Sequence, residues 1–148
     1  MPLLLIVAAG VLAIDRLTKG YVRGLHPEGG TIPVIPGVFH ITPSLNSGAA
    51  FGLFPNMTWL FIVVAVVVVI FILLYGLTVR EVSTRLALGL IMGGALGNLV
   101  DRLTTGLVVD FLDFRIWPVF NLADSAIVVG ALLLTFRLLR DARGERPQ

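Results

Sequence analysis

The chain has 148 residues, of which 57% are hydrophobic and 14% are charged, and its formal net charge is +2. An ordinary soluble domain carries about a quarter charged residues, so the composition excludes that class and predicts a polytopic membrane protein. The small positive charge is better explained as a membrane topology signal than as a nucleic-acid footprint. The absence of cysteine excludes disulfides, thiolate catalysis and zinc–thiolate sites. Two histidines are too few for a histidine-rich metal site, although carboxylates could still hold a metal.

Four apolar segments predict an all-α membrane protein with four transmembrane helices, organised as a single integral membrane domain over 1–148. The first covers 3–22; no Lys or Arg precedes it, so we expect a retained helix and not a cleaved signal peptide. The second, 58–77, contains no charged residue and gives the clearest span. The third and fourth cover 86–102 and 119–139. Glycines recur at every fourth position of the third segment and predict a flat face for close helix contact: Gly89, Gly93 and Gly97.

The distribution of arginine predicts the orientation. Arginines gather between the second and third segments and after the fourth, and the positive-inside rule makes that side cytoplasmic, with both termini. Segments 23–56 and 103–118 are then outside. The first is β-rich, and its prolines should limit strand pairing to edges. The second resembles a strand followed by a proline-controlled entry into the last helix. The arginines are Arg80, Arg85, Arg137, Arg140, Arg143 and Arg146, and the prolines are Pro33, Pro36 and Pro43.

Most other polar residues fall at one depth, at the predicted outer ends of the helices. Asp15 and Lys19 are one helical turn apart and can pair. Asn98 and Arg102 have the same spacing, and Asp101 is a neighbour of both. Pairing alone can explain Asp15 and Lys19, because an unpaired polar group near lipid is costly. For Arg102, a structural role and a role in holding a carboxylate or a carbonyl group near a functional site are equally compatible with the sequence.

Two carboxylates have no charged partner nearby in the sequence. Asp110 and Asp113 are three residues apart in a predicted strand, so they point to opposite faces, and only Asp113 can pair with Arg115. Asp124 is the third residue of the last helix, where Asn121 is a plausible N-cap, and helix-start chemistry alone can explain both. At a common depth, Asp110 and Asp124 could instead share one proton and act as acid and base.

Five runs of residues, in order over nearly the whole chain, resemble the motif set of type II signal peptidase, the lipoprotein signal peptidase family of bacteria. They are DRLTK (15–19), NSGAAFG (46–52), GGALGNLVDRL (93–103), VVDFLDF (108–114) and FNLADSAI (120–127). The resemblance implies a membrane aspartyl endopeptidase that removes the signal peptide from a prolipoprotein, cutting before its diacylglyceryl-modified cysteine.

The resemblance also implies roles for single residues. Asp110 and Asp124 match the catalytic pair of the family, one activating a water and the other protonated to stabilise the oxyanion. Arg16 departs from the pattern, because the family usually has Gln there, and it leaves the pairing around Asp15 open. The positions that line or support the site are matched by Asn46, Asn98, Arg102, Asn121, Asp15 and Lys19.

The implied partners are a prolipoprotein signal peptide with its diacylglyceryl-cysteine and membrane lipid, with no nucleic acid, no metal and no cofactor. The implied location is the bacterial cytoplasmic (inner) membrane, with the active site at the outer face, and we expect a monomer.

Three other functions compete with the peptidase. A proton or ion carrier would also place carboxylates in membrane helices, but the inner halves of the spans lack polar residues to continue a path. A serine hydrolase could use Ser47 with His40 as base, although the nucleophile-elbow motif is missing. A non-catalytic assembly subunit could use the glycine face of the third segment.

Overall fold

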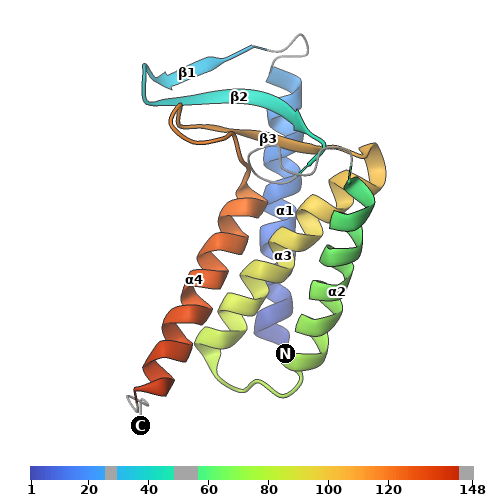
Figure 1. The fold of residues 1–148 in the computed structure, drawn as a ribbon, viewed down its shortest axis with the longest axis vertical. Coiled ribbons are helices and arrows are strands. Elements are labelled where there is room, and N and C mark those ends of the chain that lie inside the picture. The colour runs from blue at the N-terminus through green and yellow to red at the C-terminus, as the bar shows by residue number, and fades with distance from the viewer. Residues whose placement is uncertain (26–29, 49–56, 144–148) are drawn as a thin grey trace.

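The structure, a computed structural model, describes residues 1–25, 30–48 and 57–143. Within these residues, four helices stand together and a three-stranded sheet covers one end of them (Figure 1). This confirms the predicted fold class of a mostly helical membrane protein with a small β-rich segment. The elements are α1 (Pro2–Leu25), β1 (Ile32–Ile35), β2 (Phe39–Asn46), α2 (Thr58–Gly76), α3 (Val82–Thr105), β3 (Val108–Asp113) and α4 (Leu122–Ala142).

Three of the four helices are long and apolar enough to cross a membrane: α2, α3 and α4. The mean hydropathy of α2 reaches 3.0, in agreement with the clearest predicted span. Helix α1 has 24 residues, a sufficient length, but it carries Asp15, Arg16, Lys19 and Arg23. A membrane span by α1 therefore stays a prediction.

Helix α3 is the centre of the bundle and packs against α1, α2 and α4. Its glycines make this possible, as predicted. A Cβ on Gly93 would lie 2.7 Å from the carbonyl oxygen of Ala8 and from Cβ of Val11, both in α1. A Cβ on Gly89 would collide with α1 in the same way, and Gly130 of α4 lies equally close to the backbone of α3. The apolar core beside these contacts includes Leu4, Ala8, Ile72, Val79, Leu88 and Met92.

The sheet is antiparallel with the order β1-β2-β3, so β2 is its central strand. Pro33 lies on the edge strand β1, as expected, but Pro43 lies in β2, which differs from the prediction that prolines stay at edges. The register between β2 and β3 shifts between Ile41 and Ser44, and this irregularity accommodates a residue that has no N–H to donate. Ser44 is then opposite Asp110.

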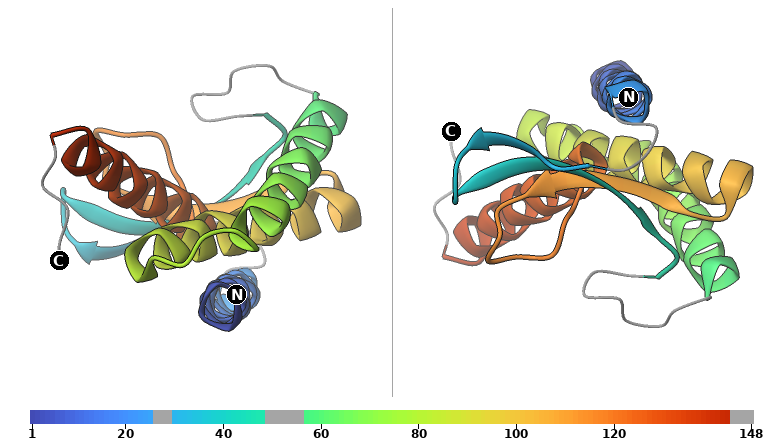
Figure 2. Two further views of the ribbon diagram at one scale, coloured as in Figure 1. Left: turned by 90° about the horizontal axis from the view of Figure 1, so that it is seen from below. Right: turned by 90° about the horizontal axis from the view of Figure 1, so that it is seen from above.

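The sheet brings the segment before α4 back over the helices. Leu112 of β3 forms an isolated bridge with Phe120, and their backbone groups exchange hydrogen bonds of 2.8 and 3.1 Å. Seen from above, β3 lies over the end of the helix bundle and runs from the end of α3 toward the connection that leads to α4 (Figure 2). Asp110 of β3 and Asp124 at the start of α4 are thereby held at the same end of the bundle.

Replacing Gly93 with Ala should destabilise the fold by about 1–3 kcal/mol, because the added methyl group has no space against α1. Gly10 provides a matched control, since it lies on the exposed face of α1 and a Cβ there meets nothing within 4 Å. Gly10→Ala should be neutral or slightly stabilising. Thermal unfolding of both purified variants in detergent checks this, and equal midpoints would contradict the close packing of α1 on α3.

Candidate active site

The N-terminus of α4 carries a capping box, as the sequence predicted. The side-chain oxygen of Asn121 accepts the backbone N–H of Asp124 at 2.9 Å, and Oδ2 of Asp124 accepts the backbone N–H of Asn121 at 3.3 Å. This reciprocal pair fixes the position of the Asp124 carboxylate at the start of the helix.

Asn121 also contacts the second candidate carboxylate. Its amide Nδ2 donates to Oδ1 of Asp110 at 2.6 Å, and Asn46 of β2 donates to Oδ2 of Asp110 at 2.9 Å. The predicted pair Asp110 and Asp124 is thus brought together around one asparagine, which is itself fully buried. The same residue explains the helix start and joins the two acids.

Asn98 of α3 links this pair to the interior of the bundle. Its amide Nδ2 donates to Oδ1 of Asp124 at 2.7 Å, and its carbonyl oxygen accepts from Asn121 and from Nζ of Lys19. Asn98 therefore uses its side chain for these three residues instead of pairing with Arg102, which its spacing had allowed.

The ammonium group of Lys19 is fully buried and has three acceptors. It lies 2.9 Å from Oδ2 of Asp15, 2.9 Å from Oδ2 of Asp101 and 3.0 Å from Oδ1 of Asn98. The predicted pair of Asp15 with Lys19 is confirmed, but it is part of a larger cluster. Burial of these charges is tolerable because each is paired and hydrogen-bonded.

The two acids of this cluster also hold the backbone of the site. Oδ1 of Asp15 accepts the N–H of Ala123, next to Asp124, at 3.1 Å. Oδ2 of Asp101 accepts the N–H of Val109, next to Asp110, at 3.3 Å. Helices α1 and α3 thereby position the residue that precedes each of the two candidate aspartates.

Arg16, the residue that departs from the family pattern, pairs with Asp101. Its Nη1 donates to Oδ1 of Asp101 at 2.6 Å, while Nη2 of Arg23 lies 3.5 Å from the same oxygen. The open question about Asp15 is answered by this geometry: the added charge goes to the other acid of the cluster. Asp15 and Asp101 are therefore accompanied by three positively charged side chains, those of Lys19, Arg16 and Arg23.

Arg102 lies at the other side of the site. Its Nη2 donates to the carbonyl oxygen of Gly48 at 3.2 Å, and its guanidinium carbon lies over the ring of Phe61, 4.9 Å from the centroid. Gly48 is in turn held by Asn46, whose Oδ1 accepts the N–H of Gly48 at 2.9 Å. Residues 49–52 of the second motif lie outside the described residues.

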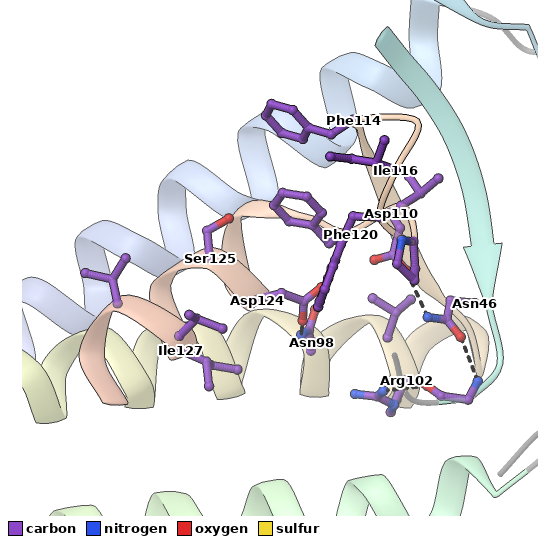
Figure 3. Close-up of a pocket in the computed structure, with 17 residues that line it drawn as sticks. Asn46, Asn98, Arg102, Asp110, Phe114, Ile116, Phe120, Asp124, Ser125 and Ile127 are labelled. Carbon is purple, nitrogen blue, oxygen red and sulfur yellow. Dashed lines mark hydrogen bonds between the residues drawn. The ribbon is translucent and has the colours of Figure 1, made fainter. Parts of the chain in front are cut away.

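These side chains line a cavity of about 750 Å³ between α4, the β3–α4 connection and α3 (Figure 3). Asp110, Asp124, Asn46, Asn98 and Arg102 supply its polar wall. The rest of the lining is mostly apolar and comes from Gly48, Val108, Phe114, residues 116–120 and the first turns of α4. A cavity with a few convergent polar groups and an apolar remainder is the usual form of a binding site for an amphipathic molecule.

The chain matches the model of the family described as signal peptidase (SPase) II over residues 7–140. It belongs to the signal peptidase II family. The lipoprotein signal peptidase of Pelotomaculum thermopropionicum is 52% identical over 141 residues, which cover 94% of this chain and 93% of that protein. The lipoprotein signal peptidase of Moorella thermoacetica is 51% identical over 151 residues, which cover 99% and 100%.

Solved structures agree with this assignment. A bacterial membrane enzyme determined by the in meso method at 2.3 Å resolution superposes with a TM-score of 0.90 at 30% identity, covering 100% of this chain and 94% of that one. A second bacterial membrane enzyme, determined at 1.9 Å, gives 0.86 at 31% identity, covering 95% of each chain. The predicted family and fold class are therefore confirmed.

The two aspartates of β3 have opposite environments in this member of the signal peptidase II family. Burial and the nearby charge of Asp124 raise the pKa of Asp110 to about 6, against the opposing hydrogen bonds from Asn46 and Asn121. The pKa of Asp113 is lowered, first by the backbone N–H of Arg115 and then by Thr42 and the Arg115 guanidinium. The predicted pairing of Asp113 with Arg115 is confirmed at 3.3 Å.

The residues of the competing serine hydrolase lie apart from this site. Neither Ser47 nor His40 belongs to the described lining of the cavity. His40 pairs with Pro33 on one side and with Asp113 on the other within the sheet. The two side chains are therefore not placed where the carboxylates meet.

Sequence reasoning missed several residues of the cavity. Phe114, Ile116, Trp117 and Phe120 line its apolar side, and Ser125 lies beside Asp124. Ile116 lies in the β3–α4 connection, and 93% of this apolar side chain is exposed. The available signal is the concentration of aromatic and branched residues in this connection, a pattern that by itself predicts only a strand and the entry into a helix.

Proposed function

We propose that Asp110 and Asp124 are the catalytic pair of this signal peptidase II and that it cuts prolipoproteins before the diacylglyceryl-modified cysteine. The observation that carries the proposal is their meeting in one cavity around Asn121, which donates to Asp110 through its side chain and to Asp124 through its backbone. Membership of the signal peptidase II family supplies the reaction, the hydrolysis of a peptide bond.

The environments of the two carboxyl groups suggest how they divide the work. The raised pKa of Asp110 favours its protonated form, so Asp110 is suited to act as the acid. Asp124, which accepts the amide of Asn98 and the N–H of Asn121, is suited to be the ionised base. These roles describe one protonation state of the proposed dyad, in which the two carboxyl groups share one proton.

In the proposed reaction, Asp124 removes a proton from a water molecule whose oxygen forms a bond with the scissile carbonyl carbon. The carbonyl oxygen gains negative charge and is stabilised by the proton of Asp110. The C–N bond then breaks, and the proton taken from water passes to the leaving amine. This sequence uses one water and two carboxyl groups, in line with the expectation that no cofactor or metal takes part.

The substrate fits the composition of the cavity. A scissile peptide needs polar partners, which Asn46, Asn98 and Arg102 can supply. The acyl chains of a lipid-modified cysteine need apolar surface, which α4 offers through Ile127, Val128 and Val129. Apolar and polar walls in one cavity support a substrate that carries both kinds of group.

We further propose four membrane spans, including α1, with both termini cytoplasmic and the sheet and cavity at the outer face of a bacterial cytoplasmic membrane. In support, the start of α1, the α2–α3 connection and the end of α4 lie at the end opposite the sheet (Figure 1). We propose one domain, because β2, β3, α3 and α4 all contribute residues to the same cavity, and a protein that works as a monomer.

Replacing either Asp110 or Asp124 with Asn should abolish cleavage, whereas Asp113→Asn should keep substantial activity. Asn keeps size and polarity but cannot cycle between ionised and protonated forms. Asp113 is held by Arg115 and Thr42 on the sheet, outside the described cavity lining, and its loss should cost about 1–3 kcal/mol of stability. The measurement is cleavage of a lipidated prolipoprotein by purified, folded variants. Near-normal turnover by Asp124→Asn would refute the dyad.

The pH dependence of kcat/KM should show a bell whose basic limb depends on Asn46. Below a pH of about 6 the Asp110 carboxyl keeps its proton, and above it the acid form is lost. Asn46 favours the ionised form by donating a hydrogen bond. Asn46→Leu should therefore raise the pKa of Asp110 and move the basic limb to higher pH, at whatever rate remains. Asp113→Asn is the control and should leave the limb in place; a downward shift in Asn46→Leu would contradict the assignment.

Single-cysteine labelling should find the sheet outside and the end of α4 inside. The chain has no cysteine of its own, so an introduced thiol reports alone. Val38→Cys, in the exposed turn between β1 and β2, should react with a membrane-impermeant maleimide on intact cells. Arg143→Cys should react only after the membrane is opened. The reverse pattern would place the cavity at the cytoplasmic face.

A further inference from the structure

Arg102 is half-buried at the cavity wall, and its contacts there are unusual for an arginine. Within the described residues it forms no ion pair, and it contacts the carbonyl oxygen of Gly48 through one hydrogen bond and the ring of Phe61 through its guanidinium face. It nevertheless interacts electrostatically with Asp110 and Asp124. A guanidinium group has five N–H donors in its plane, so most of them are not used by the described part of the chain.

The contact with Phe61 explains how such a group can stay in place. An aromatic ring attracts a cation through its face, and this attraction uses none of the N–H donors. A carboxylate partner would hold Arg102 more strongly, but it would consume two donors and neutralise the charge. An aromatic partner keeps both the donors and the charge available at the cavity.

Phe61 is itself placed by an anchor one turn earlier in α2. Oγ1 of Thr58 donates to the carbonyl oxygen of Gly106 at 3.0 Å. Gly106 caps α3 in a left-handed conformation, with φ of 77°, and its N–H returns to the carbonyl oxygen of Arg102 at 3.1 Å. Thr58 and Phe61 are three residues apart and share a face of α2. The start of α2 is thus tied to the turn of α3 that carries Arg102.

We propose that Phe61 is a positioning residue for cleavage. Its ring holds the guanidinium group of Arg102 at the cavity wall, and the N–H donors that are not bound to Gly48 or to another described residue can bind a carbonyl oxygen of the peptide substrate. Phe61 does not belong to the described cavity lining, so it acts only through Arg102. The proposal rests on the proposed function, since the donors matter only if a peptide is bound between Arg102 and the two aspartates.

The test compares four single variants in cleavage of a lipidated prolipoprotein, per folded molecule. Phe61→Leu should lower kcat/KM about tenfold, because Leu fills similar space without attracting a cation. Phe61→Tyr keeps an aromatic face and should stay within about twofold of the parent. Phe71→Leu is the matched control: Phe71 lies on the same helix, is 62% exposed and stacks on Tyr75. It should be unchanged. Arg102→Gln should lose activity by orders of magnitude.

A double variant separates positioning from a general effect on folding. In Arg102→Gln there is no cation left to hold, so adding Phe61→Leu should cost nothing further, as single-turnover measurements with excess enzyme can show. The proposal is wrong if Phe61→Leu has parental activity, if Phe61→Tyr is as impaired as Phe61→Leu, or if the tenfold loss persists in the Arg102→Gln background.

The Asp110→Asn variant, assayed in parallel, distinguishes failure of this inference from failure of the proposed function. If Asp110→Asn is inactive and Phe61→Leu is normal, only the positioning role is wrong. If Asp110→Asn is fully active, the proposed function itself is wrong.

Discussion

A single buried ammonium group, Nζ of Lys19, joins the parts on which the site depends. An isolated charge in a protein interior is costly, and it is tolerated only where its partners compensate it. Here three acceptors surround it: Asp15, Asp101 and Asn98. Each of these partners also forms a hydrogen bond next to the site. Asp15 accepts a backbone N–H of α4, Asp101 accepts a backbone N–H of β3, and Asn98 donates to the carboxylate of Asp124. The geometry of the proposed dyad is therefore tied to the folding of the bundle.

Two positively charged side chains near the proposed dyad, Lys19 and Arg102, have different roles. Lys19 is fully buried against Asp15, Asp101 and Asn98, so its role is to hold other groups in place. Arg102 is held by Gly48 and Phe61, and most of its N–H donors are not used by the described residues. Breaking a buried pair by removing one partner costs about 3–5 kcal/mol, which is a penalty on folding. Removing a donor at the cavity affects the bound reactants instead. The distinction follows from which atoms each cation contacts.

Local spacing in the sequence was enough to predict some of these features. The capping box of Asn121 and Asp124, the pair of Asp113 with Arg115 and the flat glycine face of α3 each involve residues within one or two turns. The partner of Arg16 could not be predicted in this way, because Asp101 is 85 residues away. Phe61 gave no signal at all, since α2 is apolar throughout and has no polar face to set it apart. Pro43 in a central strand depended on a register shift that only the paired strands reveal. The catalytic assignment of Asp110 and Asp124 still rests on the resemblance and on their geometry.

Helix α1 has a distribution of side chains that suits the membrane span proposed for it, although its hydropathy does not mark it as a span. Its polar side chains Asp15 and Lys19 are fully buried, while Leu17 and Tyr21, on other faces of the same turns, are 73% and 70% exposed. This is the reverse of a helix on a soluble protein, where the apolar face is covered. In a bilayer the arrangement is favourable, because lipid covers the apolar face and the charges compensate one another inside the bundle. Arg16 and Arg23 are partly exposed and reach Asp101 from the edge of this interior, so their long side chains can keep contact with the interface. A helix of this kind can carry the charges that position a hydrolytic site without presenting them to lipid.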